Sequence, residues 1–400
     1  MNSELLFGLD LGSDQFVCVA GERGSNGMPT VRGVAKAPSV GIRKGIVSDP
    51  VAAGQAIRDV LEAVSAQIGS AIGPLVVSIA GEAVKGYGAQ GFLPIYPAGR
   101  EITRDDVLQV INHSRQTVLP PGIEQIQVIP REFRVDHQRG VQKPVGMPAS
   151  KFEVVTLLVT APSHVRSGYE EAIRNGGGTV HSFVYGPAAS GLGVVRPEDL
   201  EMGCLVIDLG AEKTEGALFA NGSIAHGLYV GVGGRMVTSD ISKLLKTSVE
   251  EAERLKRESG SARPDMVGEE ESVEVLQLGQ THLRPMQRRV LAEIIQSRIR
   301  EIALMVKEEL AVQGVSQLPA GGILLTGSGS LLSGVEKVFD EVFEVKGSRV
   351  TKGPGGDPCA ARAYGLLRLA AEADEDELAT AGTGGWKDRI RTLWSIIGGN

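Results

Sequence analysis

The sequence predicts an α/β protein built from two related halves, with an inserted α+β subdomain in the first half. Two segments, 5–19 and 204–219, share one motif: an apolar strand, an Asp-Leu-Gly turn and a second strand. Each half then continues with further strands and helices in a similar order. Between 82 and 153 the Pro and Gly content rises around one helix, which indicates the insertion.

Composition bounds the class of protein. The chain has 400 residues, of which 42% are hydrophobic and 22% charged, enough for a large core and about two or three domains. The net charge of −7 argues against an extended nucleic-acid surface, so we expect no nucleic-acid partner. The three cysteines form no Cys-x-x-Cys pair, which favours a reducing compartment over disulfides or zinc. No apolar run reaches the roughly 18 residues of a membrane span, and we expect a chain that is neither secreted nor transmembrane.

In the first half, the turn at Asp10-Leu11-Gly12 brings a carboxylate and free backbone N–H groups to one point. That arrangement suits a metal-bound phosphate, although a single such turn is weak evidence because any hairpin can use Gly. A strand over 29–36, a helix over 50–68 and a buried strand over 75–81 are expected to complete the layer.

The segment from 82 to 153 contains one predicted helix, from Thr103 to Thr117, with an N-cap and acidic residues in its first turn. We interpret it as a subdomain because structureless loops of that length are uncommon. Phe152 to Thr160 is expected to resume the core α/β pattern as a strand. The segments that follow are predicted as a helix (163–175), a strand (179–184) and a helix of small residues (186–194).

The second half repeats the order with strands over 204–208, 212–220 and 223–230, so Asp208 mirrors Asp10. The Gly-rich turn at 231–235, which contains Gly233, is either a phosphate cradle or a tight turn. Helices are predicted over 236–246, 250–257 and 287–313. On the second of these, Glu253 and Lys256 are spaced at i, i+3, and spacing alone favours a solvated surface pair.

A third motif, over 321–334, is an apolar strand, a Thr-Gly-Ser-Gly turn and a helix. The backbone at Gly327, Ser328 and Gly329 carries little side chain, so a flat base or ribose can lie against it. The closing helix at 357–367 is rich in small residues and is expected to pack tightly against another helix.

The last segment begins with an acidic and then Ala/Gly/Thr-rich stretch that is typical of a flexible linker. Beyond it, a narrow apolar stripe is flanked by basic residues, a pattern suited to lying in an anionic membrane interface. The alternative is a helix that docks on its own domain or on a partner. The residues of this candidate membrane helix are Trp386, Lys387, Arg389, Ile390, Arg391, Leu393, Trp394 and Ile397.

The order of the motifs at 8–12, 206–210, 325–329 and 357–361 resembles that of the actin, Hsp70 and sugar-kinase superfamily. There the motifs are two phosphate loops, an adenosine loop and a connecting helix. Within this superfamily the chain resembles the FtsA family of bacterial cell-division proteins essentially end to end. The resemblance is carried by 41–47, 100–107, 128–133, 144–147, 238–241 and 252–256.

The resemblance implies an actin-like, duplicated ribonuclease-H-like fold whose inserted subdomain distinguishes the FtsA family from actin. Its parts are a first core subdomain (1–81, 162–197 and 358–372), the insert (82–161), a second core subdomain (198–235 and 315–357), a helical nucleotide-side subdomain (236–314), a linker (373–385) and a membrane-targeting helix (386–400).

The resemblance also implies ATP and Mg²⁺ as ligands. Asp10 and Asp208 would hold the magnesium-bound phosphates through water. The remaining nucleotide-site residues would donate to phosphate (Gly12, Ser13, Gly210, Gly233), flank ribose and adenine (Glu253, Lys256) or form the adenosine floor (Gly327, Ser328, Gly329). No catalytic residue is identified.

The function implied is a filament on the cytoplasmic face of the inner membrane at midcell, in which the insert supplies one longitudinal contact. This filament would bind the C-terminal peptide of the tubulin-like ring protein FtsZ, tether the ring to anionic membrane and recruit later division proteins. Two alternatives stay open. A small-molecule kinase of the superfamily would need a catalytic carboxylate with its own motif, and none is identified. A membrane-assembly adaptor, similar to pilus-type relatives, would have another partner.

The chain departs from the family pattern in both phosphate loops. The second loop usually reads Asp-x-Gly-Gly-Gly-Thr, and here Ala211 and Glu212 replace two glycines, whereas Gln15 replaces a basic residue of the first loop. An inward Glu212 would repel phosphate, partly offset by Lys213, and Ala211 would be strained at positive φ. We therefore expect weak ATP binding and very slow or no hydrolysis.

Overall fold

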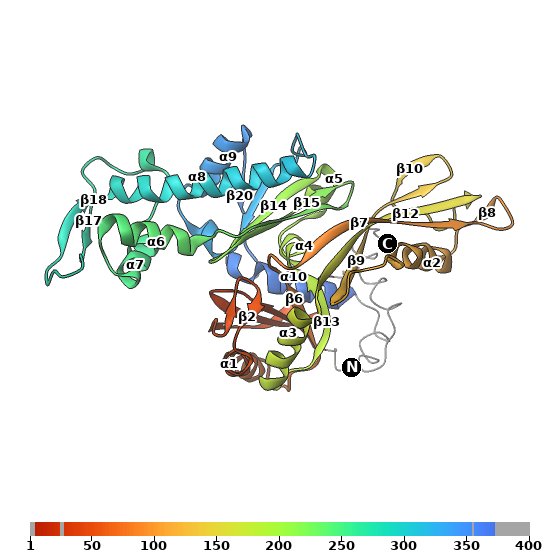
Figure 1. Cartoon of the computed structure of the whole chain (residues 1–400), viewed down its shortest axis with the longest axis horizontal. Coiled ribbons are helices and arrows are strands. Elements are labelled where there is room, and N and C mark those ends of the chain that lie inside the picture. Colours follow the sequence, from red (N-terminus) through yellow and green to blue (C-terminus); the bar gives the residue numbers. More distant parts are fainter. Residues whose placement is uncertain (1–4, 25–27, 354–355, 373–400) are drawn as a thin grey trace.

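The computed structural model describes residues 5–24, 28–353 and 356–372. The predicted linker over 373–385 and the predicted membrane helix over 386–400 lie outside these residues. Figure 1 shows an elongated molecule in which two core sheets lie at the centre, with one smaller subdomain at each end of the long axis.

The first core sheet has the order β13-β6-β1-β2-β3. β1, β2 and β3 are antiparallel neighbours, whereas β6 runs parallel to both β1 and β13. The strands are β1 (Leu5–Leu11), β2 (Gln15–Arg23), β3 (Pro29–Pro38), β6 (Leu75–Ile79) and β13 (Val180–Tyr185). The helices are α1 (Pro50–Ile68) and α3 (Ser163–Asn175), and the short strands β4 (Ile42–Arg43) and β5 (Ile46–Val47) precede α1.

The second core sheet repeats this order as β16-β15-β14-β19-β20. β14, β15 and β16 are antiparallel, and β19 runs parallel to β14 and β20, so the predicted duplication is confirmed. The strands are β14 (Cys204–Leu209), β15 (Thr214–Ala220), β16 (Ser223–Val230), β19 (Ile323–Thr326) and β20 (Arg349–Val350). Around them lie α5 (Pro197–Met202), α8 (Arg288–Val312), η2 (Ser328–Leu331) and α9 (Val335–Phe343).

The inserted segment forms a separate sheet, with the order β10-β9-β12-β7, at the right of Figure 1. Its elements are β7 (Lys85–Pro94), α2 (Arg104–Arg115), β9 (Ile123–Val135), β10 (Gln138–Val141) and β12 (Lys151–Pro162), with the small pair β8 (Arg100–Glu101) and β11 (Pro148–Ala149). Their apolar side chains form a cluster of their own, in which the rings of Phe133 and Phe152 stack at 5.5 Å.

β12 pairs along its length with both β9 and β7. The expectation that Phe152 to Thr160 resumes the core pattern was therefore wrong. Alternation of buried residues along a strand indicates that it has one covered face, but it does not indicate which sheet the strand joins.

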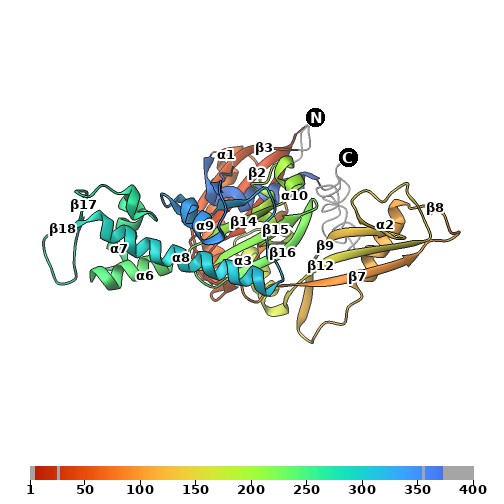
Figure 2. The same ribbon diagram turned by 90° about the horizontal axis from the view of Figure 1, so that it is seen from above.

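The opposite end of the molecule carries α6 (Gly234–Leu245), α7 (Val249–Ser259), η1 (Pro264–Met266) and the hairpin of β17 (Ser272–Val275) and β18 (Arg284–Gln287). Figure 2 shows these elements packed along the far half of α8. The hairpin was not predicted. Its strands are four residues each and mostly exposed, so they carry almost no hydrophobic pattern.

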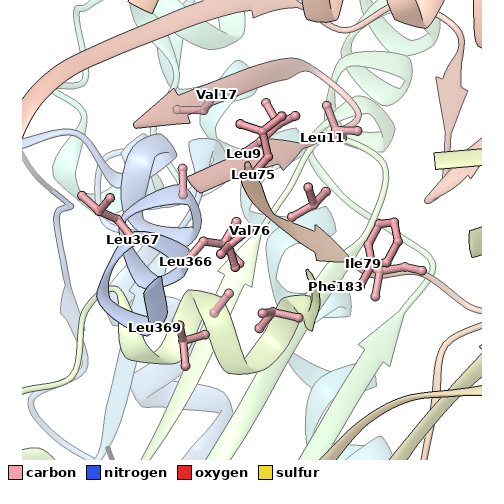
Figure 3. Packing of buried hydrophobic residues seen from close by; sticks show 14 of the residues in the cluster. Leu9, Leu11, Val17, Leu75, Val76, Ile79, Phe183, Leu366, Leu367 and Leu369 are labelled. Atoms are coloured by element: carbon pink, nitrogen blue, oxygen red, sulfur yellow. The ribbon is translucent and has the colours of Figure 1, made fainter. Parts of the chain in front are cut away.

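Two helices that cross between the core sheets bring the halves together: α4 (Gly186–Leu192) and α10 (Ala361–Glu372), the latter preceded by η4 (Pro358–Ala360). Leu366, Leu367 and Leu369 of α10 lie among the apolar residues of the first sheet in Figure 3. A Cβ atom on Gly365 would lie 1.9 Å from the Ala189 carbonyl oxygen. The closing helix therefore packs as closely as its small residues predicted.

Candidate functional site

The two mirrored aspartates lie at the ends of β1 and β14, where they line one small cavity of about 60 Å³. Asp10 Oδ1 accepts a hydrogen bond of 2.6 Å from Ser78 Oγ in β6. Asp208 Oδ2 accepts one of 2.7 Å from Ser190 Oγ in α4. The structure thus brings together the two carboxylates that the sequence singled out, from strands in different halves.

Arg362 of α10 lies between these carboxylates. Its Nη2 is 2.8 Å from Asp208 Oδ2 and 3.0 Å from Glu215 Oε2, and its Nη1 is 3.8 Å from Asp10 Oδ1. Its Nε donates to Ser190 Oγ at 2.8 Å. Sequence reasoning missed this arginine. The available signal was a single basic residue among the small residues of the closing helix.

Lys213 completes the buried cluster, because its Nζ lies 2.9 Å from Glu215 Oε2. Asp10, Lys213, Glu215 and Arg362 are all buried. Burial raises the pKa of Asp10, with the Arg362 charge opposing that shift, and burial lowers the pKa of Lys213. Burial also opposes the charge on Arg362, but its three carboxylate neighbours hold the pKa of the guanidinium above its ordinary value. Arg362 is therefore a permanent cation.

The first loop presents an unused polar group to the same cavity. Ser13 is buried, and its Oγ has no hydrogen-bond partner among the described residues. Next to it, a Cβ atom on Gly12 would lie 2.8 Å from the Gln15 carbonyl oxygen, so the turn is too tight for a side chain. A buried hydroxyl without a partner is costly, and a ligand with acceptor oxygens would satisfy it.

The second loop has neither a strained backbone at Ala211 nor a Glu212 carboxylate directed at the phosphate position, the two effects that its sequence suggested. Ala211 is not among the residues with positive φ. Glu212 Oε2 accepts from the Lys44 backbone N–H at 2.7 Å, and its Oε1 lies 2.8 Å from Arg235 Nη1. Lys213, which was expected beside Glu212, faces Glu215 instead.

These contacts join the two halves beside the cleft. Arg235 Nη2 donates to the Ser13 carbonyl oxygen at 2.9 Å, so Arg235 contacts both the first loop and Glu212 of the second. Arg257 of α7 approaches Asp14 at 3.7 Å. The halves are thus in contact through their own side chains.

A larger cleft of about 760 Å³ adjoins the small cavity, shares Asp14, Gln15 and Ser328 with it, and extends along α7. Glu253 and Lys256 line it, together with Thr238, Ser328 and Gly329. Lys256 Nζ donates to Glu253 Oε2 at 2.6 Å, and Thr238 Oγ1 donates to the same oxygen at 2.5 Å. Burial raises the pKa of Glu253, but these hydrogen bonds outweigh burial and hold it below its ordinary value. The pair therefore borders a cleft whose volume suits a small molecule.

The third motif crosses the end of β14. Gly327 has φ +80°, and a Cβ atom there would lie 2.2 Å from Asp208 Oδ1. On Gly329 a Cβ atom would lie 2.8 Å from the Leu209 Cβ. Ser328 lines both the small cavity and the larger cleft. Glycine is required here because the loop lies directly against the aspartate.

The Gly-rich turn at 231–235 lies behind the second loop. The Gly234 N–H donates to the Gly210 carbonyl oxygen at 2.9 Å, and a Cβ atom on Gly233 would lie 2.5 Å from that oxygen. Gly210 lines the small cavity and Gly234 the larger cleft, whereas Gly233 lines neither. In this structure Gly233 therefore acts as the tight turn that supports the second loop.

Comparison with known proteins agrees with this geometry. A profile described as "Cell division protein FtsA" matches residues 205–381, and one described as "SHS2 domain inserted in FTSA" matches residues 81–160. A cell division protein FtsA from Borreliella burgdorferi is 32% identical over 86% of this chain and 83% of its own. The chain belongs to the FtsA family.

Two further relatives extend the match. The FtsA of Streptococcus pneumoniae is 32% identical over 94% of this chain and 82% of its own length. The FtsA of Escherichia coli (strain K12) is 27% identical over 97% of both chains. This FtsA-family chain is thus a cell-division protein of the actin-like class, as the motif order predicted.

Solved structures confirm the actin-like fold. A "PilM-PilN type IV pilus biogenesis complex" aligns with a TM-score of 0.64 and 18% identity, covering 92% of this chain and 98% of that one. MreB5 of Spiroplasma citri bound to ADP aligns with a TM-score of 0.54 and 13% identity, covering 95% and 99%. Within the described residues, no helix combines the length and apolarity that a bilayer crossing requires.

Proposed function

We propose that this FtsA-family chain binds ATP, polymerises on the cytoplasmic face of the inner membrane at midcell, tethers the FtsZ ring there and recruits later division proteins. The observation that carries the nucleotide part is a pair of adjoining pockets, one lined by Asp10 and Asp208 and the other by Glu253 and Lys256, which share Asp14, Gln15 and Ser328 in their linings. The pocket beside the aspartates offers the Ser13 hydroxyl, which has no partner among the described residues, to a phosphate. The larger pocket offers Glu253 and Lys256 to ribose and adenine, with the third motif as a floor.

We expect ATP to bind weakly and to be hydrolysed very slowly or not at all. Asp10 and Asp208 are the carboxylates nearest the phosphate end, and both are already engaged by serine hydroxyls and approached by Arg362. Calorimetry and a phosphate-release assay on the full chain test this expectation. A turnover near 1 per second, ordinary for a working enzyme, would contradict it.

The side chains present do not fit a magnesium ion held between Asp10 and Asp208. Magnesium is bound by oxygen atoms in octahedral geometry and keeps several waters. Here a guanidinium lies between the two carboxylates instead. No group of three or more His, Cys, Asp or Glu side chains able to hold a metal occurs in the described part of the chain. We therefore assign no step to a protein-bound magnesium ion.

The membrane and FtsZ parts rest on family membership and on the sequence of residues 386–400. Burial of two Trp and three aliphatic side chains at roughly 1.5 kcal/mol or more each is enough for reversible binding, which many copies in a filament reinforce. The test is co-sedimentation of the full chain with anionic vesicles and the FtsZ C-terminal peptide, beside a chain lacking Trp386–Asn400. Truncated protein that still floats with the vesicles would contradict the assignment of the helix.

The proposed filament contact lies on the inserted sheet, where β7 is an edge strand among the described residues. Tyr87 of β7 and Tyr96 after it are 55% and 88% exposed, and exposed apolar groups on a sheet edge favour association. We expect the double variant Tyr87→Lys and Tyr96→Lys to bind ATP and to form no filaments on a lipid monolayer in electron microscopy. Unchanged filaments would place the contact elsewhere.

Point variants are preferable to removing 82–161, because the insert is bonded to both halves. Gln127 Oε1 accepts from the Tyr185 N–H at 2.9 Å, and Ser223 Oγ donates to the Pro130 carbonyl oxygen at 2.7 Å. A matched control is Val51→Lys on α1, where the side chain is 75% exposed outside the insert.

The two alternatives predict different results. A small-molecule kinase would release ADP in the presence of an acceptor, and an adaptor for another assembly would bind vesicles without binding the FtsZ peptide. Family membership across most of the chain favours division over both.

A further inference from the structure

The cavity between Asp10 and Asp208 already holds a cation that belongs to the protein. Asp208 Oδ2 faces the Arg362 guanidinium and the Ser190 hydroxyl. Its other oxygen, Oδ1, lies close to Gly327, where a Cβ atom would be 2.2 Å from it. One oxygen of Asp208 is therefore already paired with a protein cation, and there is little room beside the other on the Gly327 side.

Asp10 also has a serine hydroxyl and Arg362 as neighbours, but both are near only one of its carboxylate oxygens. Its Oδ1 accepts from Ser78 and lies 3.8 Å from Arg362 Nη1. Its Oδ2 is directed toward the first loop, where a Cβ atom on Gly12 would lie 3.7 Å away. Arg362 thus reaches one carboxylate from each half, and Glu215 as well.

The charges of the buried cluster are nearly balanced without any added ion. Three carboxylates (Asp10, Asp208 and Glu215) face two cations (Arg362 and Lys213). These charges sum to −1, so a divalent cation placed here would leave a net charge of +1 in a largely buried site, where charges are weakly screened.

We propose that Arg362 takes the place of a divalent cation as the counter-ion that joins Asp10 of the first half to Asp208 of the second, so that the closed arrangement of the halves does not depend on magnesium. This proposal deepens the proposed nucleotide function by assigning the metal's role to a side chain. Any magnesium that accompanies a nucleotide would then be held by the phosphates and not by these aspartates.

The test follows thermal unfolding of the full chain without nucleotide, in millimolar MgCl₂ and in EDTA. Wild type is expected to unfold within about 1 °C in the two buffers, because it has no metal to gain. Arg362→Met, of similar length but uncharged, leaves the carboxylates short of a cation. It should unfold at lower temperature in EDTA and recover at least about 3 °C in MgCl₂. Arg362→Lys keeps the charge and should show no such recovery.

Recovery of the unfolding temperature of Arg362→Met in MgCl₂ distinguishes a counter-ion role from a packing role. Loss of packing alone would lower the unfolding temperature equally in MgCl₂ and in EDTA. Stabilisation of wild type by magnesium, or a loss in Arg362→Met that magnesium does not touch, would overturn the proposal.

If Arg362→Met fails to fold, manganese binding to wild type, followed by electron paramagnetic resonance, decides the question. Absence of binding, or binding that persists unchanged in both Asp10→Asn and Asp208→Asn, upholds the proposal. Binding that either variant weakens or abolishes overturns it. Neither measurement uses nucleotide. If ATP failed to bind in calorimetry, the proposed function would be refuted, but the unfolding and manganese measurements would still decide the role of Arg362.

Discussion

The two halves of the molecule place an aspartate at the same point of the same sheet, yet surround it differently. Asp10 in β1 lies opposite Val17 in β2, whereas Asp208 in β14 lies opposite Glu215 in β15. Residues directly opposite on antiparallel strands lie on one face, so the second half has two adjacent carboxylates where the first has one.

This difference explains the buried cations. A second carboxylate cannot be buried beside Asp208 without compensation, and Arg362 and Lys213 supply it. The first half needs less compensating positive charge, because Val17, opposite Asp10, carries no charge. The aspartate therefore has the same position in both halves of the duplicated fold, whereas the charges around it differ.

The largest loss of stability is expected when Glu215, the additional carboxylate of the second half, is removed. Glu215→Ala leaves Lys213 buried without its partner and should lower the free energy of unfolding by about 3–5 kcal/mol. Val17→Ala at the mirrored position removes apolar contact alone, for about 1–2 kcal/mol. Chemical denaturation measures both.

The pair can also be replaced as a unit. The double change Lys213→Met and Glu215→Leu should recover most of the stability that Glu215→Ala loses, because no charge is left without its partner. Equal losses for the single and double changes would show that packing, not charge, distinguishes the halves.

The next test concerns the tight glycine turn that follows the aspartate in both halves. A Cβ atom on Gly12 would lie 2.8 Å from the Gln15 carbonyl oxygen, and one on Gly210 would lie 2.7 Å from that of Lys213. Gly12→Ala and Gly210→Ala should therefore cost similar amounts, about 1–3 kcal/mol each. Gly88→Ala is the control, since no atom lies within 4 Å of a Cβ there. Clearly unequal losses of stability for Gly12→Ala and Gly210→Ala would show that the two turns are not equivalent.

A smaller effect is the pH dependence of Asp10. Burial raises its pKa above the ordinary value of 3.8, so the folded chain holds this proton more tightly than the unfolded chain. That contribution to stability is present below 3.8 and is lost as pH rises. The stability of wild type relative to Asp10→Asn should fall as the pH rises above about 4 in denaturant titrations.

Asp106 in the insert gives a control of opposite sign. Arg100, together with Thr103, lowers the pKa of Asp106 against the effect of burial. The stability of wild type relative to Asp106→Asn should therefore fall as pH decreases below 3.8. Slopes of the same sign for both variants would contradict the assigned environments.

The smallest effect is expected at Glu212. It contacts Lys44 and Arg235 and lines neither the small cavity nor the larger cleft, so Glu212→Gly should change ATP affinity by less than about threefold, or less than about 0.7 kcal/mol. Isothermal titration calorimetry tests it. A large gain in affinity would mean that this carboxylate faces the phosphate after all.

The local structure and the polar ends of the strands follow from the residues of each segment. α1 (Pro50–Ile68) and α3 (Ser163–Asn175) have the predicted bounds, because the helical period and the Gly residue that follows each helix are encoded locally, and α1 also has Asp49 as its N-cap. Asp10, Asp208 and the third motif lie at one cleft for a similar reason, since each follows an apolar strand that must be buried.

Which side chains come into contact depends on the packing of elements that are far apart in the sequence. Arg362 is 154 residues from Asp208, and no local pattern links them. Glu215 joins the cluster because strand register places it opposite Asp208, and β12 joins the inserted sheet because β7 and β9 flank it. Glu212 accepts a hydrogen bond from the Lys44 backbone because elements of the two halves lie side by side there. Register and the packing of distant elements fix these contacts, and both depend on the whole chain.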